Sequence, residues 1–156
     1  MIRTRKATLD DLPVLLEFEQ EIIRAERPFD ITLKEGKISY YDIKAMISAD
    51  DIEVIVVVDS DNIPVSSGYA SVVTPKTYFK FDKFAYLGFM YTIPSYRGKG
   101  MNKILIKALF DWISAKKIHE VRLDVYTENI GAIKAYEKAG FKKNLLNMRV
   151  DLRNVL

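Results

Sequence analysis

The chain has 156 residues, of which 49% are hydrophobic and 29% are charged, and its formal net charge is +3. Such a chain is long enough to bury a core, so we expect one domain over residues 1–156. The sequence contains no cysteine, which excludes a disulfide framework and a cysteine nucleophile, and no apolar run approaches the ~20 residues of a membrane span, so we expect a cytoplasmic protein without a membrane partner.

Alternating side chains at the start of the chain predict a strand over residues 2–7. Apolar residues at helical spacing then predict a helix that runs to about Glu26, with Asp10 as its N-cap. Thr32 and Glu35 form a candidate capping box, and we expect a second helix to begin there. The N-terminal third is therefore predicted to contain one strand and two helices.

Three strands are predicted in the middle of the chain. Residues 52–59 are rich in β-branched side chains, which suit a buried strand. Residues 63–73 form the next strand of a hairpin, in which Gly68 is a candidate bulge. Residues 84–91 are nearly all apolar, so we expect this strand to be covered on both faces.

The C-terminal half alternates helices with strands. The best-defined helix begins at Met101 and carries an apolar stripe at helical spacing. A strand over residues 121–126 follows, and then a short helix that ends where Gly140 can adopt a left-handed conformation. One or two final strands are expected over residues 141–152. The predicted fold class is α/β, with a mixed sheet flanked by helices.

The junction between the strand that ends near Thr92 and the helix that follows has the features of an anion site. Gly98 and Gly100 lack a Cβ, so their N–H groups can approach a ligand closely. The helix N-terminus adds free N–H donors and a positive dipole end, which favour phosphate. Arg97 and Lys99 add positive charge. An ordinary strand–helix connection remains the alternative.

This junction resembles the acyl-CoA loop of the GCN5-related N-acetyltransferases (GNAT family), whose signature reads Gln/Arg-x-x-Gly-x-Gly/Ala. Arg97 and Gly100 fit that signature, whereas Asn102 stands where glycine or alanine is usual. A second family motif is similar to the run Asn129-x-x-Ala132-x-x-x-Tyr136-x-Lys138-x-Gly140-Phe141. The second motif follows the first by one helix and one strand, which is the order that the family requires.

The resemblance implies a mixed, mostly antiparallel sheet whose fourth and fifth strands splay apart to admit acetyl-CoA, and it implies no metal ion. Backbone groups of Met90, Tyr91 and Thr92 would then hold the pantetheine arm. Asn129 would contact the arm near the fifth strand, although a simple helix cap is the alternative. The pyrophosphate would be bound by backbone N–H groups in the loop, at Arg97, Gly98, Lys99, Gly100, Met101 and Asn102.

The family reaction is the direct transfer of the acetyl group to a primary amine within a ternary complex. By position in the motif, Tyr136 is the implied general acid, although it could be only a packed aromatic. Some relatives have a carboxylate base on the fourth strand where this chain has Tyr86, and tyrosine is a poor base. Glu26 or Asp124 could act instead through a water chain, although either could be an ordinary surface acid.

Charge is distributed unevenly. Residues 10–35 hold eight acids and three bases, whereas residues 76–149 hold fifteen bases and six acids. An acidic side suits a cationic amine, either a small molecule or a protein, and a basic side suits a polyanionic cosubstrate. Two rival functions stay open: a silent acyl-CoA-binding module, and a nucleic-acid binder, which the acidic third disfavours. Dimers are common in the family, so a homodimer is also an expectation.

Overall fold

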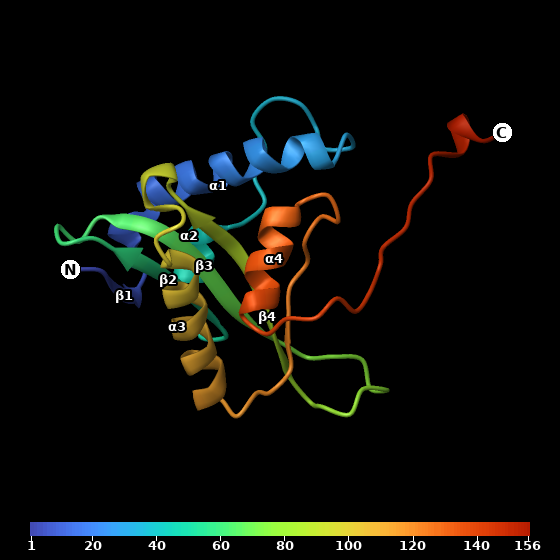
Figure 1. Cartoon of the computed structure of the whole chain (residues 1–156). Coiled ribbons are helices and arrows are strands. Elements are labelled where there is room, and N and C mark those ends of the chain that lie inside the picture. The colour runs from blue at the N-terminus through green and yellow to red at the C-terminus, as the bar shows by residue number, and fades with distance from the viewer.

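The computed structural model describes residues 1–156, and its sheet has five strands in the order β1-β2-β3-β4-β5 (Figure 1). The strands are β1 (Arg3–Lys6), β2 (Ile52–Val58), β3 (Pro64–Val73), β4 (Phe84–Thr92) and β5 (Val121–Arg122). The helices are α1 (Leu12–Glu26), α2 (Ile43–Ser48), α3 (Met101–Ala115) and α4 (Ile130–Lys138). Neighbouring strands are antiparallel except β4 and β5, which are parallel. No helix has the length and apolar character that a membrane span needs.

Helices cover both faces of the sheet. The side chains of β2 alternate between the two faces, as they must in an extended chain. Val54, Val56 and Val58 pack against α1 and α2. Ile55 and Val57 pack on the opposite face, against α3. In Figure 1, α4 lies beyond β4, at the end of the sheet opposite β1. The predicted α/β class with helices on a mixed sheet is confirmed.

The pairing of β3 with β4 contains the predicted bulge. The register shifts between Ser67 and Tyr69, so Gly68 lies at the irregularity. A Cβ on Gly68 would come within 2.7 Å of the sulfur of Met90, which explains why the position lacks a side chain. On the facing strand Phe89 has φ +57°, a conformation that a bulky residue rarely adopts. The distortion changes the direction of β4 before its C-terminal end.

The two parallel strands separate soon after they meet. Only Ala85 with Val121 and Tyr86 with Arg122 are paired, although β4 continues to Thr92. The predicted strand over residues 121–126 is therefore shortened to two residues. The remaining length of β4 has no neighbour on that side, and a gap opens between β4 and residues 123–126. This gap is the splay that the family resemblance implied.

Two details of the N-terminal third differ from the prediction. Asp10 is not the helix cap, because a 3-10 turn over Leu9–Asp11 precedes α1, and the Asp11 carboxylate accepts the N–H of Thr8 at 2.8 Å. The second helix does not begin at Thr32. Helix α2 starts at Ile43, where the Asp42 carboxylate caps it by accepting the Ala45 N–H.

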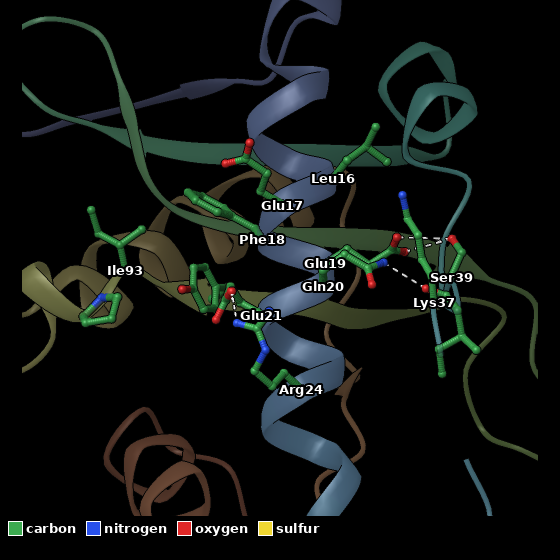
Figure 2. Close-up of a pocket in the computed structure, with 13 residues that line it drawn as sticks. Leu16, Glu17, Phe18, Glu19, Gln20, Glu21, Arg24, Lys37, Ser39 and Ile93 are labelled. Carbon is green, nitrogen blue, oxygen red and sulfur yellow. Dashed lines mark hydrogen bonds and ion pairs between the residues drawn. The ribbon is translucent and has the colours of Figure 1, made fainter. Parts of the chain in front are cut away.

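A buried carboxylate explains why residues 31–42 are not helical. Glu19 of α1 is only 1% exposed and accepts the backbone N–H groups of Tyr40 and Tyr41 at 3.0 and 2.8 Å. The hydroxyl of Ser39 also donates to it, as Figure 2 shows. In a helical segment these N–H groups would instead donate to backbone carbonyls of the same helix. Glu19 therefore holds the segment against α1 in an irregular conformation.

The final strands predicted over residues 141–152 do not form. Only a short 3-10 turn, Leu152–Asn154, follows α4. In Figure 1 this end of the chain, at the red end of the colour scale, runs away from the sheet and the helices. A strand needs a partner for its backbone groups, and within one copy this segment has none.

We expect Glu19→Ala to lower the free energy of unfolding by about 3 kcal/mol, since it leaves the partly buried N–H groups of Tyr40 and Tyr41 without an acceptor. Glu19→Gln keeps a carbonyl oxygen at the same place and should cost about 1 kcal/mol or less. Urea unfolding of both variants measures the difference. Equal losses for the two variants would contradict the proposed role of the acceptor oxygen.

Candidate active site

A cluster of free backbone donors lies at the junction between β4 and α3. The N–H groups from Gly98 to Lys103 donate no hydrogen bond within the chain. Gly98 and Gly100 have φ values of +73° and +82°, which glycine adopts without strain and which turn successive N–H groups toward one side. The N–H of Arg97 is already bonded to the Pro94 carbonyl, so the free donors begin one residue later than expected.

Positive side chains surround these donors. The Nε of Arg97 donates to the Thr92 carbonyl at 2.9 Å, and its guanidinium lies over the ring of Tyr91. Lys99 lies over the ring of Tyr96. Neither Arg97 nor Lys99 forms an ion pair with a carboxylate. Their charges are therefore available to a polyanion at the N-terminus of α3.

The end of β4 forms one wall of the gap. The N–H of Ile93 donates to the carbonyl of Val65 on β3. Successive N–H groups along an antiparallel strand point to opposite edges, so the N–H of Thr92 points away from β3. There it faces the gap and has no strand partner. Ser66 fixes this wall from behind, because its hydroxyl donates to the Tyr91 carbonyl at 2.6 Å and lies 2.9 Å from the Thr92 hydroxyl.

Helix α4 supplies the second predicted motif. The Oδ1 atom of Asn129 accepts the Ala132 N–H at 3.3 Å, so Asn129 is a helix cap, while its amide N–H groups donate to no protein atom. The ring of Tyr136 packs edge-on against Phe141, at 5.9 Å between ring centroids. Gly140 has φ +101°, which confirms the predicted left-handed end of the helix.

Glu26 lies at the end of α1, among tyrosines that come from different parts of the chain. Burial raises the pKa of its carboxyl group above the usual glutamate value, while the Tyr40 hydroxyl acts in the opposite direction. Burial, with a smaller contribution from the Glu26 charge, raises the pKa of Tyr136 to about 12. Burial and the hydrogen bond to Asp30 raise the pKa of Tyr126, and the Glu26 charge adds a smaller effect in the same direction. The Glu26 carboxylate therefore lies near enough to Tyr136 for its charge to act on that hydroxyl.

The other two predicted relay residues form a pair of their own. The Tyr86 hydroxyl donates to Oδ2 of Asp124 at 3.0 Å. Burial and the Asp124 charge raise the pKa of Tyr86, so this hydroxyl stays protonated and acts as a donor. The pair joins β4 to the segment beyond β5, and it lies beside Tyr69, whose pKa is raised by burial and by Asp124.

Comparison with known proteins gives the same fold and a family. The sequence model of the acetyltransferase (GNAT) family matches residues 17–141. The chain belongs to the GNAT family. A mutant of the BH1408 protein from Bacillus halodurans has a TM-score of 0.86 at 18% identity, over 96% of this chain and 98% of that one. A predicted acetyltransferase from Clostridium acetobutylicum, solved with acetyl-CoA, has a TM-score of 0.73 at 20% identity, over 99% and 98%.

A third structural neighbour is glucosamine-6-phosphate N-acetyltransferase from Arabidopsis thaliana. Its TM-score is 0.69 at 17% identity, over 97% of this chain and 98% of that one. GNAT proteins use acetyl-CoA. The features of this chain fit that molecule, since the free N–H groups from Gly98 to Lys103 suit a pyrophosphate and the open side of β4 suits an extended amide-containing arm.

Several residues near Glu26 could not be identified from sequence as part of a site. The Tyr40 hydroxyl is buried without a hydrogen bond of good geometry, yet lies near enough to Glu26 to affect the pKa of both groups. Tyr126 donates to Asp30 at 3.2 Å, and Arg149 donates to the same carboxylate at 2.8 Å. These residues come from distant segments and share no motif, so only the fold reveals their proximity.

A separate hollow of about 800 Å³ lies along α1 (Figure 2). Its walls include Glu17, Phe18, Ser39 and Ile93, but neither Glu26 nor Tyr136 lines it. In Figure 2 the Phe18 side chain lies on the Ile93 side of α1, whereas Glu19 and Gln20 face Ser39. The hollow adjoins the end of β4, where Tyr91 and Ile93 line it.

We expect Gly100→Val to weaken acetyl-CoA binding by about tenfold or more, because a β-branched residue at φ +82° strains the loop by about 1–2 kcal/mol. The added Cβ itself meets no atom within 4 Å, so backbone strain rather than crowding is the cause. Calorimetric titration measures the affinity. Gly36→Val, at φ +76° in another loop, is the matched control and should leave the affinity nearly unchanged.

Proposed function

We propose that the protein is an acetyl-CoA-dependent N-acetyltransferase that acetylates a primary amine by direct attack within a ternary complex. One observation carries the proposal. The half-buried carboxylate of Glu26 lies near enough to Tyr136 for its charge to add to the effect of burial in raising the pKa of that hydroxyl, and both come from helices next to the gap between β4 and β5. A base and an acid at the same opening are what amine acylation requires.

In this proposal the chain binds acetyl-CoA with groups that the fold leaves free. The N–H groups of Gly98, Lys99, Gly100, Met101 and Asn102 hold the pyrophosphate, with Arg97 and Lys99 as positive side chains. Backbone groups of Met90, Tyr91 and Thr92 hold the pantetheine arm along β4. The free amide N–H groups of Asn129 reach the arm from α4. When bound, acetyl-CoA supplies the activated acetyl group as a thioester.

Glu26 is the proposed general base. An alkylamine with a pKa of about 10.4 is only about 0.04% neutral at pH 7, so a proton must be removed before attack. Burial raises the pKa of Glu26 and brings it nearer to neutral pH, which strengthens it as a base. The Asp124 carboxylate accepts a hydrogen bond from the Tyr86 hydroxyl, and in this scheme it holds the far wall of the gap in place.

Tyr136 is the proposed general acid for the departing thiolate. Its hydroxyl remains protonated at neutral pH because burial and the Glu26 charge raise its pKa to about 12. A proton on this oxygen can be donated as the sulfur becomes negative. Free N–H groups of β4, such as that of Thr92, face the same gap and can stabilise an oxyanion.

The proposed acceptor is a cationic primary amine, either a small molecule or a group on a protein. Residues 10–35 hold eight acids and three bases. Glu17 and Glu21 of this stretch line the hollow along α1, next to the end of β4. A negative surface raises the local concentration of a cationic substrate before it reaches Glu26.

Thiol release from acetyl-CoA, measured against polyamines, amino acids, aminoglycosides and lysine peptides, tests the proposal. Turnover with any amine, and an N-acetylated product by mass spectrometry, would support it. A parallel binding titration separates the alternative function. Tight acetyl-CoA binding without turnover across the panel would favour a silent acyl-CoA-binding module instead.

We expect Glu26→Gln to lower kcat/KM by about 100-fold, because the amide cannot accept the amine proton. The wild-type pH–rate profile should lose activity on the acid side as Glu26 is protonated, at a pH above the usual glutamate pKa of 4.5. Initial rates between pH 5 and 9 measure this effect. Asp111→Asn, an exposed change on α3, is the control and should keep the wild-type profile.

The same variant has a testable effect on stability. Glu26 has a higher pKa in the folded protein than in the unfolded chain, so the folded state binds its proton more tightly. The contribution of the protonated Glu26 carboxyl group to the stability of the folded state is fully present below the unfolded pKa. It is lost as pH rises through the folded pKa. Glu26→Gln should therefore be more stable than the wild type at pH 7, and this difference should shrink toward pH 4. A gap that widens toward low pH would contradict the burial of this carboxyl group.

Tyr136→Phe should lower kcat by about tenfold or more while the acetyl-CoA affinity changes by less than about twofold. The reason is that only the proton donor is removed, while the ring that packs against Phe141 stays. Steady-state kinetics with a calorimetric titration separates the two effects. Tyr78→Phe, on an exposed loop, is the matched control. Unchanged turnover in Tyr136→Phe would exclude Tyr136 as the acid.

A further inference from the structure

The loop between β3 and β4, residues 74–83, carries the exposed aromatic side chains of the protein. The two strands are paired as far as Val73 and Phe84, and the loop is longer than the about 2–5 residues that close most hairpins. Tyr78 and Phe79 in this loop are 73% and 38% exposed, and every other aromatic side chain is buried or half-buried. Two adjacent exposed rings on one loop indicate a contact surface.

The loop packs against β5 through one arginine. The Cζ atom of Arg122 lies 4.7 Å from the ring centroid of Phe79 and 4.8 Å from that of Phe84. It also lies 5.4 Å from the ring of Phe81, which is stacked on Phe79 with 5.4 Å between centroids. These cation–π contacts anchor the loop on β5. Tyr78, whose ring centroid is 4.8 Å from that of Phe79, is left at the exposed end.

Free lysines accompany the two exposed rings. Lys76, Lys80 and Lys83 belong to the same loop and are exposed. Lys116 and Lys117 are exposed in the turn before β5, and since β4 and β5 are parallel, the segments that enter them lie at the same end of the sheet. None of the five forms an ion pair with a carboxylate. Their charges are therefore available to an anionic partner.

Acids at this end of the sheet are fewer. Asp82 is the one acid in the loop, and Glu120 is paired with Arg122 at 3.1 Å. Asp50 and Asp51 precede β2, whereas the loop leans toward β5 through Arg122. The positive side chains are therefore concentrated on the β4–β5 side. In Figure 1 the loop projects at the lower right, at the opposite end of β4 from the loop before α3.

We propose that residues 74–83 dock the protein on an anionic lipid surface, with the rings of Tyr78 and Phe79 at the headgroup level and the lysines against negatively charged lipids. Aromatic rings are favoured at a membrane–water interface, and lysines are attracted to anionic lipids. We expected no membrane partner because no apolar run spans a bilayer, but surface docking needs no spanning segment. The docking is independent of the proposed transferase activity, because the loop before α3 lies at the other end of β4 and stays open to solvent.

A single-stranded nucleic acid fits this surface less well. A base binds by stacking on an open ring face. The Tyr78 ring is already flanked by Phe79 and by the ammonium of Lys76, which lies 6.0 Å from its centroid. The Phe79 ring is flanked by Tyr78, Phe81 and Arg122. Partition into a lipid interface depends on exposed apolar area instead, and both rings keep part of theirs exposed.

Vesicle sedimentation with the full chain is the first test. Vesicles of phosphatidylcholine with about 30% phosphatidylserine are compared with vesicles of phosphatidylcholine alone at low salt. We expect partitioning to be at least about tenfold stronger on the anionic vesicles, and this difference should disappear at about 0.5 M salt because salt screens surface charges. Equal partitioning on both kinds of vesicle, or binding to neither, would overturn the proposal.

Matched charge removals locate the surface. Lys76→Gln combined with Lys80→Gln removes two positive charges from the loop and should weaken partitioning on anionic vesicles by about 20-fold or more. Lys34→Gln combined with Lys44→Gln removes the same net charge from exposed positions after α1 and in α2, and should change it by less than about twofold. Melting by circular dichroism checks that both double variants are folded. Equal losses would show attraction by net charge alone and contradict a docking loop.

The fluorescence of Tyr78→Trp reports whether the loop enters the lipid interface. The wild type, whose one tryptophan is Trp112 in α3, gives the background signal. On anionic vesicles we expect the emission of the introduced tryptophan to shift to shorter wavelength and to be protected from a water-soluble quencher. Vesicle-bound protein without this shift would place another surface against the lipid, and the proposal would fail.

A labelled single-stranded oligonucleotide tests the rival partner with the same double variants. We expect weak binding that the loop variant and the control variant reduce equally. Tight binding that only Lys76→Gln with Lys80→Gln abolishes, together with no binding to anionic vesicles, would identify the loop as a nucleic-acid surface and exclude the lipid surface.

Discussion

The separation of β4 from β5 is the constraint on which the rest of this structure depends. β4 and β5 pair through only two residues of each strand. The C-terminal half of β4 is therefore left with free backbone groups on that side, in the middle of the domain. Unpaired groups are costly unless a ligand or water satisfies them. The bulge at Gly68 and the strained Phe89 direct β4 into this arrangement, and Ser66 fixes the end of the strand from behind.

Three elements around the gap contribute different chemical groups. The loop before α3 contributes donors and positive charge, α4 contributes Tyr136, and α1 contributes Glu26. Glu19, two turns earlier on α1, holds Tyr40 and Tyr41 in place and so builds part of the buried surroundings that shift the pKa of Glu26. The same helix thus carries a structural carboxylate, Glu19, and the carboxylate that we propose as the general base, Glu26.

The sequence was informative where a local pattern has only one physical solution. The apolar stripe from Met101 predicted α3, and Gly140 predicted the end of α4. It was misleading where a long-range contact competes with a local preference. Thr32 was expected to start a helix, but its N–H and hydroxyl bond to Asp30, while Glu19 takes the N–H groups further along. No pattern within residues 31–42 reveals the position of a carboxylate on α1.

The sequence alone determined the α/β class, the GNAT resemblance and the glycine turn at residues 98–100, because periodicity, glycine and motif spacing act within short segments of the chain. Only the tertiary structure decided which carboxylate has a charge that acts on Tyr136, since Glu26 and Tyr136 belong to α1 and α4, which are far apart in the sequence. It also decided the state of residues 141–152, whose alternation describes a strand. Alternation specifies which side of a segment is apolar and suited to burial. A strand forms only where another strand offers its backbone groups as hydrogen-bond partners.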